Sequence, residues 1–214
     1  MWIWISETAD TLAMAEIESV ISEKLTSNPK LIITANAERI ENLLQRISGK
    51  HKISYKCQVP MIIYCCDRVN NYQKAGGQCI VSNSEHRDIL AQFITGMVYD
   101  LEKCPMAENE AENFANDTAG SEDLYLWEDE GTVVSMAMIA HCTDVYGRIN
   151  TVYTDSDKRG KGYGGMLVSE VTQKLLDENR IPMLYTEKDN AGSNAMYRRI
   201  GYSACGELIT YLFG

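Results

Sequence analysis

The spacing of apolar residues switches between helical and strand-like several times in the first third of the chain. From Thr11 to Leu25 apolar side chains recur at near-helical spacing, which is typical of an amphipathic helix. Short apolar runs such as "KLIITA" (30–35) are typical of buried strands. The expected elements are strands at 2–6, 30–35, 52–58 and 61–66 and helices at 11–25 and 38–47. This β-α-β-α-β-β order predicts a small N-terminal α/β extension, which contains no glycine loop or acid–base cluster that would indicate a function.

A polar segment with a glycine pair, "NNYQKAGGQ" (70–78), follows the extension and predicts a linker. We therefore expect an extension at 1–74 and a second domain at 75–214. The second domain is predicted to hold a strand at 79–82, helices at 84–103 and within 106–123, strands at 124–128, 132–142 and 147–154, a helix at 162–178, a strand at 182–187, a helix at 191–200 and a strand pair within 202–213. The residues "DEG" at 129–131 indicate a hairpin turn. Such an order predicts an α/β fold with a mixed sheet.

Composition is typical of a globular protein. The 214 residues can bury one large core or two small ones. No apolar run approaches the roughly 20 residues of a membrane-spanning helix. The start, "MWIWISETAD", lacks the basic segment of a signal peptide. We expect a cytoplasmic protein with no membrane partner.

The cysteines and histidines do not indicate a metal site or a disulfide framework. There are seven cysteines, an odd number, without CxxC spacing. Several lie in apolar runs such as "MIIYCCD", where reduced thiols act as small hydrophobic side chains. The three histidines are scattered along the chain, and we expect them to be solvated or structural.

Charge is distributed unevenly between the two predicted domains. The net charge is −10, and residues 1–74 carry 9 Lys/Arg against 8 Asp/Glu, so the acidic excess lies in residues 75–214. Nucleic acid is therefore not an expected partner, because phosphate backbones require a basic face. Lys158, Arg159 and Lys161 cluster within this acidic region, which indicates either an anion site or a solvated charge run.

The three basic residues belong to a glycine-rich stretch, "DSDKRGKGYGGM" (155–166), which lies between a predicted strand and a predicted helix. A Walker A loop requires Ser or Thr after the lysine, but Gly162 follows Lys161. The dinucleotide pattern GxGxxG is present at Gly160, Gly162 and Gly165. Six residues separate Tyr153 from Gly160, however, whereas a Rossmann turn begins almost directly after its strand.

A third pattern fits the loop and the sequence after it. Residues 159–164, "RGKGYG", match (Q/R)-x-x-G-x-(G/A), and "DNAGSNAMYRRIGY" follows at 189–202. These two motifs resemble the cofactor motifs of the GNAT superfamily of acetyl-CoA-dependent N-acetyltransferases, and the resemblance covers roughly residues 78–214. It implies a mixed, mostly antiparallel sheet with a splayed central strand pair, flanked by helices. The stretch "DSDK" departs from the proline-rich turn that is common in the family.

The resemblance also implies how acetyl-CoA would be held. The strand before the loop would pair with the pantetheine arm, and the loop at the start of the following helix would hold the pyrophosphate, because a helix N-terminus presents unpaired N–H groups and partial positive charge. The residues assigned to the cofactor in this way are Val152, Tyr153, Thr154, Arg159, Gly160, Lys161, Gly162, Tyr163, Gly164, Gly165, Asn190, Ser193 and Asn194.

Catalysis would be attack of a neutral amine on the thioester, followed by expulsion of a thiolate. In the family a tyrosine on the helix after the second wall strand protonates the leaving sulfur, and Tyr197 occupies that position. A backbone N–H near Val152 would stabilise the oxyanion. The general base is left open between Asp144, Glu128, Glu187 and a water chain, because the strand "GRINTVYT" carries no carboxylate.

We therefore expect an acetyl-CoA-dependent N-acetyltransferase that needs no metal and acts on a small-molecule or peptide amine. The acidic second domain would suit a cationic acceptor. The extension would shape the acceptor site, form a homodimer contact, or be a degenerate duplicated half-domain. The alternative function is a non-catalytic acyl-CoA-binding or sensing protein, which the missing strand carboxylate favours and Tyr197 opposes.

Overall fold

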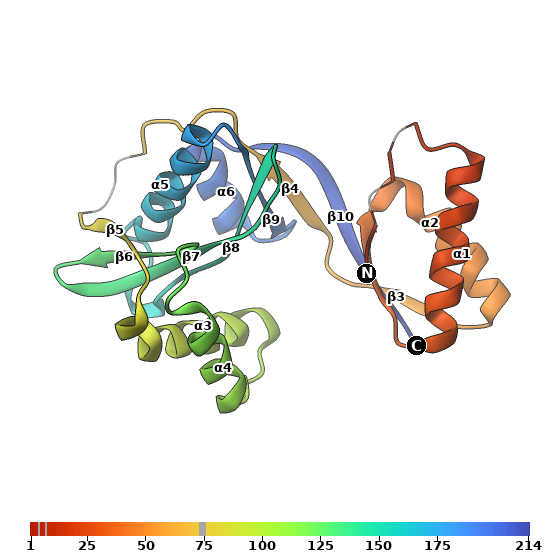
Figure 1. The fold of residues 1–214 in the computed structure, drawn as a ribbon, viewed down its shortest axis with the longest axis horizontal. Helices are drawn as coiled ribbons and strands as arrows, with labels where there is room; N and C mark the ends of the chain where they lie inside the picture. The colour runs from red at the N-terminus through yellow and green to blue at the C-terminus, as the bar shows by residue number, and fades with distance from the viewer. Residues whose placement is uncertain (4, 7, 73–75) are drawn as a thin grey trace. The chain divides into compact units, whose positions relative to one another are not determined.

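The chain folds into two compact units, each of which is described by itself. The computed structural model describes residues 1–3, 5–6, 8–72 and 76–214 (Figure 1). The terminal unit comprises Met1–Ile63, Tyr185–Ala191 and Ala204–Gly214, and the central unit comprises Tyr64–Leu184 and Gly192–Ser203. The boundary expected between residues 74 and 75 falls on positions outside the described residues, as does part of the predicted linker, so it stays a prediction.

Two helices and a small group of strands make up the terminal unit. Its helices are α1 (Thr11–Ser27) and α2 (Ala37–His51), and its strands are β1 (Trp2–Ile3), β2 (Ile32–Asn36), β3 (Tyr55–Cys57) and most of β10 (Ser203–Phe213). Strand β1 runs parallel to β2, and β10 pairs antiparallel with both β2 and β3. The Asp10 carboxylate caps α1 by accepting the Ala13 N–H at 2.8 Å. The order of elements expected for the extension is confirmed.

The C-terminal strand pair predicted at 202–213 is wrong, because the segment forms the single strand β10. Gly206, the one glycine between the ends of this segment, lies inside the strand. Residues Leu208–Leu212 pair with Ile32–Asn36 of β2. Phe213 and Tyr211 are each 1% exposed in the core between the strands and the two helices. A turn at Gly206 would remove these aromatic side chains from that core, so their burial favours the continuous strand.

The central unit is built on a mostly antiparallel sheet. Strands β5 (Gln78–Val81), β6 (Leu124–Asp129), β7 (Thr132–Cys142) and β8 (Tyr146–Thr154) are antiparallel neighbours in this order, and β9 (Ile181–Glu187) pairs parallel with β8. Strand β4 (Met61–Cys65) ends in this unit, where the Cys66 N–H donates to the Pro182 carbonyl at 3.0 Å. The predicted mixed α/β class is confirmed.

Helices cover both faces of this sheet, because alternate strand residues point in opposite directions. Tyr125 and Trp127 pack with α5 (Tyr163–Asp177), whereas Leu124 and Leu126 pack with α3 (Arg87–Glu102) and α4 (Glu108–Thr118). A short 3₁₀ turn, Ser84–His86, precedes α3, and α6 (Ala191–Ile200) follows β9. The predicted hairpin turn is confirmed, since Glu130 (φ 49°) and Gly131 (φ 74°) both have positive φ, as a type I′ turn requires.

Strand β8 is irregular near its carboxyl end. Met138 pairs with Asn150 and Met136 with Tyr153, so β8 contains one residue more than β7 between these two pairs. Thr151 there has φ 50°, a left-handed conformation that a β-branched residue rarely adopts. The parallel register with β9 covers only Tyr146–Arg148 of β8. The bulged end of β8 leads directly into the glycine-rich loop.

Candidate functional site

The glycine-rich loop caps the N-terminus of α5 and uses two glycines for backbone conformation. After β8, a 3₁₀ turn at Ser156–Lys158 leads to Gly160 (φ 79°) and Gly162 (φ 94°), and Gly162 is the N-cap of α5. Both φ values lie in the left-handed region that glycine adopts without strain. The first N–H groups of an α-helix have no intrahelical acceptor. The loop thus presents backbone donors and the positive end of the helix dipole to an anion.

The next two glycines allow α5 to approach its neighbours closely. A Cβ on Gly164 would lie 2.7 Å from Thr154 Oγ1, and one on Gly165 would lie 2.3 Å from the Tyr72 hydroxyl. The motif therefore combines two requirements, since positions 160 and 162 need the left-handed conformation and positions 164 and 165 need close packing. The closeness of Tyr72 was not expected, because it lies in the segment predicted as a linker.

Arg159 is held beside the loop by three groups. Its Nε donates to the Thr154 carbonyl at 3.0 Å, and its Nη2 lies 2.5 Å from Oδ2 of Asp100 near the end of α3. Its guanidinium carbon lies 5.2 Å from the centroid of the Tyr153 ring, within cation–π range. Both members of the ion pair are more than 40% exposed, so the contact orients Arg159 more than it stabilises the fold.

Ser135 fixes the end of β8 from the neighbouring strand. Its hydroxyl donates to the Tyr153 carbonyl at 2.7 Å and lies 2.9 Å from Thr154 Oγ1. Ser135 is fully buried, and its hydrogen-bonded hydroxyl restricts the position of the backbone that it contacts. At the start of α5, the Tyr163 hydroxyl donates to Asp129 at 2.5 Å, and this hydrogen bond raises the pKa of Tyr163. Ser135 belongs to no recognisable motif, and Asp129 was noted only as part of the predicted hairpin turn, so sequence reasoning missed these two contacts.

The bulge in β8 lies two residues before the end of the strand, where the backbone near Val152 was expected to stabilise an oxyanion. A bulge removes residues from the regular ladder and leaves backbone groups available to other partners. The positive φ of Thr151 is a strained conformation, and such strain is concentrated at functional sites. This geometry supports a role for backbone donors at Val152. Nothing in the residue types of "GRINTVYT" indicates the bulge.

Tyr197 lies on α6 within a cluster of tyrosines. It is 6% exposed, and its ring centroid lies 6.2 Å from that of Tyr64 and 5.9 Å from that of Tyr202. Tyr202 has its own partner, since its hydroxyl lies 2.7 Å from Thr172 Oγ1. Burial raises the pKa of Tyr197 well above its ordinary value, because ionisation would place a charge in an apolar environment. The phenol is neutral at pH 7, as an ordinary tyrosine is, and burial makes it a weaker acid.

The remaining predicted residues fall in both units. Ser193 and the buried Asn194 lie on α6 in the central unit, whereas Asn190 belongs to the terminal unit, where its N–H donates to the Glu187 carbonyl at 3.1 Å. Lys161 is exposed on the loop. The loop residues and the end of β8 are thus brought together in one unit.

The candidates for the general base are dispersed. Asp144 is exposed in the turn before β8, at the opposite end of this nine-residue strand from the loop. At about 3.3 Å per residue the strand spans roughly 26 Å, which is too far for direct proton transfer at Val152. Glu128 on β6 accepts a hydrogen bond from Gln78 Nε2 at 3.0 Å, and Glu187 belongs to the terminal unit.

Two other kinds of feature are absent from the described ranges, 1–3, 5–6, 8–72 and 76–214. Within them no group of three or more His, Cys, Asp or Glu side chains is placed to hold a metal ion. No helix there has both the length and the apolar composition needed to cross a membrane.

The model of the acetyltransferase (GNAT) family matches residues 88–202, more than half of the chain. The chain belongs to this family. The matched region begins in α3, contains the loop and α6, and ends at Tyr202, so it includes most of the geometry described above. In this GNAT chain, the motif at 159–164 leads into α5, and the motif at 189–202 contains α6.

Individual proteins are similar to this chain in sequence or in fold. A mycothiol acetyltransferase of Corynebacterium aurimucosum is 30% identical over 94 residues, which cover 39% of this chain and 31% of that protein. A GNAT-family acetyltransferase from Colwellia psychrerythraea has a TM-score of 0.63 at 13% identity, covering 98% of this chain and 75% of the other. A GCN5-related N-acetyltransferase from Kribbella flavida has a TM-score of 0.63 at 16% identity, covering 98% and 77%. The two structures show a shared fold that extends over the N-terminal residues.

Proposed function

We propose that this GNAT protein transfers an acetyl group from acetyl-CoA to a primary amine by direct attack in a ternary complex. The observation that carries the proposal is the loop at the start of α5. Gly160 and Gly162 adopt left-handed conformations there, beside unpaired helix N–H groups and Arg159. Backbone donors, helix dipole and guanidinium together suit a pyrophosphate. The partial match to a mycothiol acetyltransferase supports acetyl transfer as the reaction class.

The chain's residues would act at three points of the reaction. Acetyl-CoA supplies the thioester, whose C–S bond breaks as the amine nitrogen bonds to the carbonyl carbon. Backbone donors at the β8 bulge near Val152 would stabilise the negative charge that develops on the carbonyl oxygen. Tyr197 would give its phenolic proton to the departing sulfur and regain one from solvent. The proton lost by the amine passes to a base that we do not assign.

Turnover with and without the Tyr197 hydroxyl tests this function. We expect wild-type protein to release CoA thiol from acetyl-CoA with at least one member of a panel of amines, amino acids and polyamines. We expect Tyr197→Phe to lower kcat by about 10²- to 10⁴-fold, the usual contribution of a general acid, with little change in acetyl-CoA affinity. Thiol release is followed with a disulfide reagent, and affinity is measured by calorimetry.

Tyr146→Phe is the matched control for the tyrosine variant, because Tyr146 is 42% exposed at the far end of β8 and its hydroxyl should not affect turnover. Tight acetyl-CoA binding without turnover on any amine would contradict the transferase function and favour a non-catalytic acyl-CoA-binding protein. Equal activity of Tyr197→Phe and wild type would remove Tyr197 from the mechanism.

A further inference from the structure

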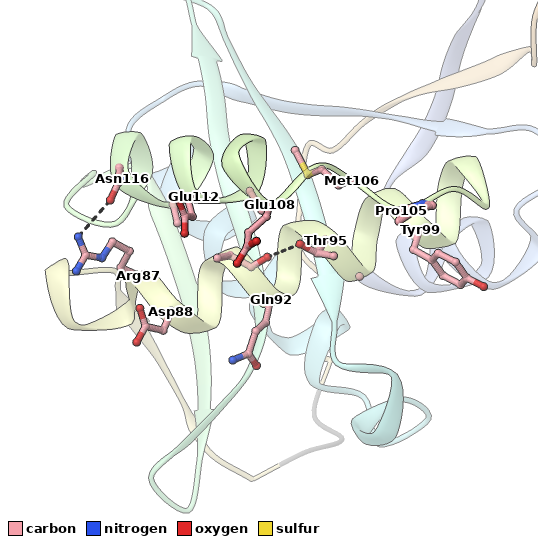
Figure 2. A pocket seen from close by; sticks show the side chains of 14 residues that line it. Arg87, Asp88, Gln92, Thr95, Tyr99, Pro105, Met106, Glu108, Glu112 and Asn116 are labelled. Atoms are coloured by element: carbon pink, nitrogen blue, oxygen red, sulfur yellow. Dashed lines mark hydrogen bonds between the residues drawn. The ribbon is translucent and has the colours of Figure 1, made fainter.

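A groove with a volume of about 960 Å³ runs between α3 and α4 (Figure 2). The two helices pack their apolar sides onto the sheet through Leu90, Phe93 and Ala115. Small residues such as Ala91 and Gly96 line the groove and leave it open. Its volume lies near the upper end of the range for small-ligand sites, roughly 300–1,000 Å³. The groove is therefore large enough for a bound ligand.

The groove carries more negative than positive charge. Asp88 of α3 and Glu108 and Glu112 of α4 line it, and Figure 2 shows both glutamates on the side of α4 that faces α3. The single lining cation among the described residues, Arg87, donates to Asn116 Oδ1 at 3.3 Å. None of the salt bridges within the described part of the chain involves these three carboxylates. Unbalanced carboxylates on both walls favour a cationic occupant.

The spacing of the carboxylates favours an extended chain over a compact cation. Glu108 and Glu112 are four residues apart on one helix, which places their Cβ atoms about 6 Å apart. Alternate side chains of an extended peptide point the same way at roughly 6.6 Å, since each residue rises about 3.3 Å. Cations at every second peptide position would thus meet the two glutamates in turn.

The other lining groups suit a peptide backbone and its apolar side chains. Gln92, on α3 one turn after Asp88, carries an amide that can both donate to a peptide carbonyl and accept from a peptide N–H. Away from Arg87, the groove is lined by Met106, Pro105 and Tyr99, which contribute apolar surface to it (Figure 2). A polyamine has no backbone carbonyl to accept from Gln92 and would leave this surface uncovered.

We propose that the groove between α3 and α4 docks an extended basic peptide segment with a cationic side chain at every second position. The proposal goes beyond acetyl transfer, because it concerns a partner held between α3 and α4 and not the acetyl-CoA assigned to the glycine-rich loop. Its test contains no acetyl-CoA, so its outcome is independent of the proposed function.

The test measures binding of a capped peptide of alternating lysine and alanine by amide NMR titration and calorimetry at low salt. We expect shifts confined to α3, α4 and the residues between them. Replacing both glutamates (Glu108→Gln with Glu112→Gln) should weaken binding by about two- to thirtyfold, if each exposed ion pair contributes its usual free energy. Raising the salt concentration should weaken the wild-type interaction in the same direction.

The matched control is the double variant Glu110→Gln with Asp117→Asn, which removes two charges from the same helix at positions that do not line the groove. It should bind the peptide as wild type does. The proposal is overturned if both double variants lose affinity equally, if neither does, or if a peptide with the same lysines in one block binds as tightly. Equal affinity for spermidine, or self-association through the groove detected by sedimentation, would also overturn it.

Discussion

At the scale of single residues, the candidate site combines groups that belong to a motif with groups that only the fold brings near. Arg159 and Gly162 belong to the motif and could be recognised from their neighbours in sequence. Asp100, Ser135 and Thr151 could not be recognised in this way. Asp100 depends on where the end of α3 lies, Ser135 on the pairing of β7 with β8, and Thr151 on a local distortion of the backbone. Sequence reasoning therefore named the residues that we propose face an anion but missed those that hold them in position.

Gly162→Val tests the conformational role of the loop. Valine is β-branched and disfavours the φ of 94° found at this position, so the loop should reorganise and lose its backbone donors. We expect acetyl-CoA affinity to fall below detection by calorimetry while the circular dichroism spectrum is retained. Gly120→Val is the control, because a Cβ there has nothing within 4 Å and the residue has no positive φ. Unchanged affinity in Gly162→Val would show that the pyrophosphate binds elsewhere.

Asp100→Asn tests how the acidic partner of Arg159 affects anion binding. The variant retains the side-chain volume but removes the negative charge 2.5 Å from the guanidinium. We expect acetyl-CoA to bind about two- to fivefold more tightly at low ionic strength, with the gain reduced at 0.5 M salt by screening. Titration at the two salt concentrations measures this effect. Weaker binding would mean that the orientation Asp100 gives to Arg159 matters more for acetyl-CoA affinity than the charge it neutralises.

At the scale of secondary structure, periodicity predicted nearly every helix and strand of the chain. The failure at β10 has a physical cause, since Gly206 is a local turn signal that tertiary burial of Tyr211 and Phe213 overrides. Connections between elements were also not predictable. Backbone N–H of Asn70 donates to the Ile200 carbonyl at 2.7 Å, so the start of the predicted linker packs at the end of α6. Such contacts depend on segments about 130 residues apart and leave no periodic signal.

Gly201→Ala tests this connection at the end of α6. Gly201 has φ 126°, and a Cβ there would lie 2.3 Å from the Arg68 carbonyl oxygen, a backbone atom that cannot move aside alone. We expect a loss of unfolding free energy of at least about 1–3 kcal/mol, measured by urea denaturation. Gly120→Ala should change it by less than about 1 kcal/mol. If both variants unfold at the same urea concentration, residues 68–70 are not packed against α6.

At the scale of the whole molecule, the two ends of the chain belong to one unit. The core of the terminal unit contains Ile21 and Leu44 from the first residues and Tyr211 and Phe213 from the last. Sequence order suggested that the extension would be complete by residue 74. The antiparallel pairing of β10 with β2 adds the C-terminal segment to this unit.

Phe213→Ala tests whether the unit depends on this segment. Truncating a side chain that is 1% exposed should cost about 3–5 kcal/mol, and the loss should fall on the terminal unit. Hydrogen exchange should show α1 and α2 losing protection while α5 retains it. Ile32→Ala, at a β2 position 48% exposed, should have little effect on either unit. Uniform loss of protection in all helices would mean that the two units unfold together.

The pairing of β2 with β10 also affects how the chain is made. During translation β2 leaves the ribosome long before Leu208–Leu212, its antiparallel partners, are synthesised. Until then one edge of β2 has unpaired N–H and carbonyl groups, and the apolar faces of α1 and α2 lack the two aromatic residues of β10. The terminal unit therefore cannot complete its folding until residues 208–212 have been synthesised, and the nascent N-terminal segment exposes apolar surface during that delay.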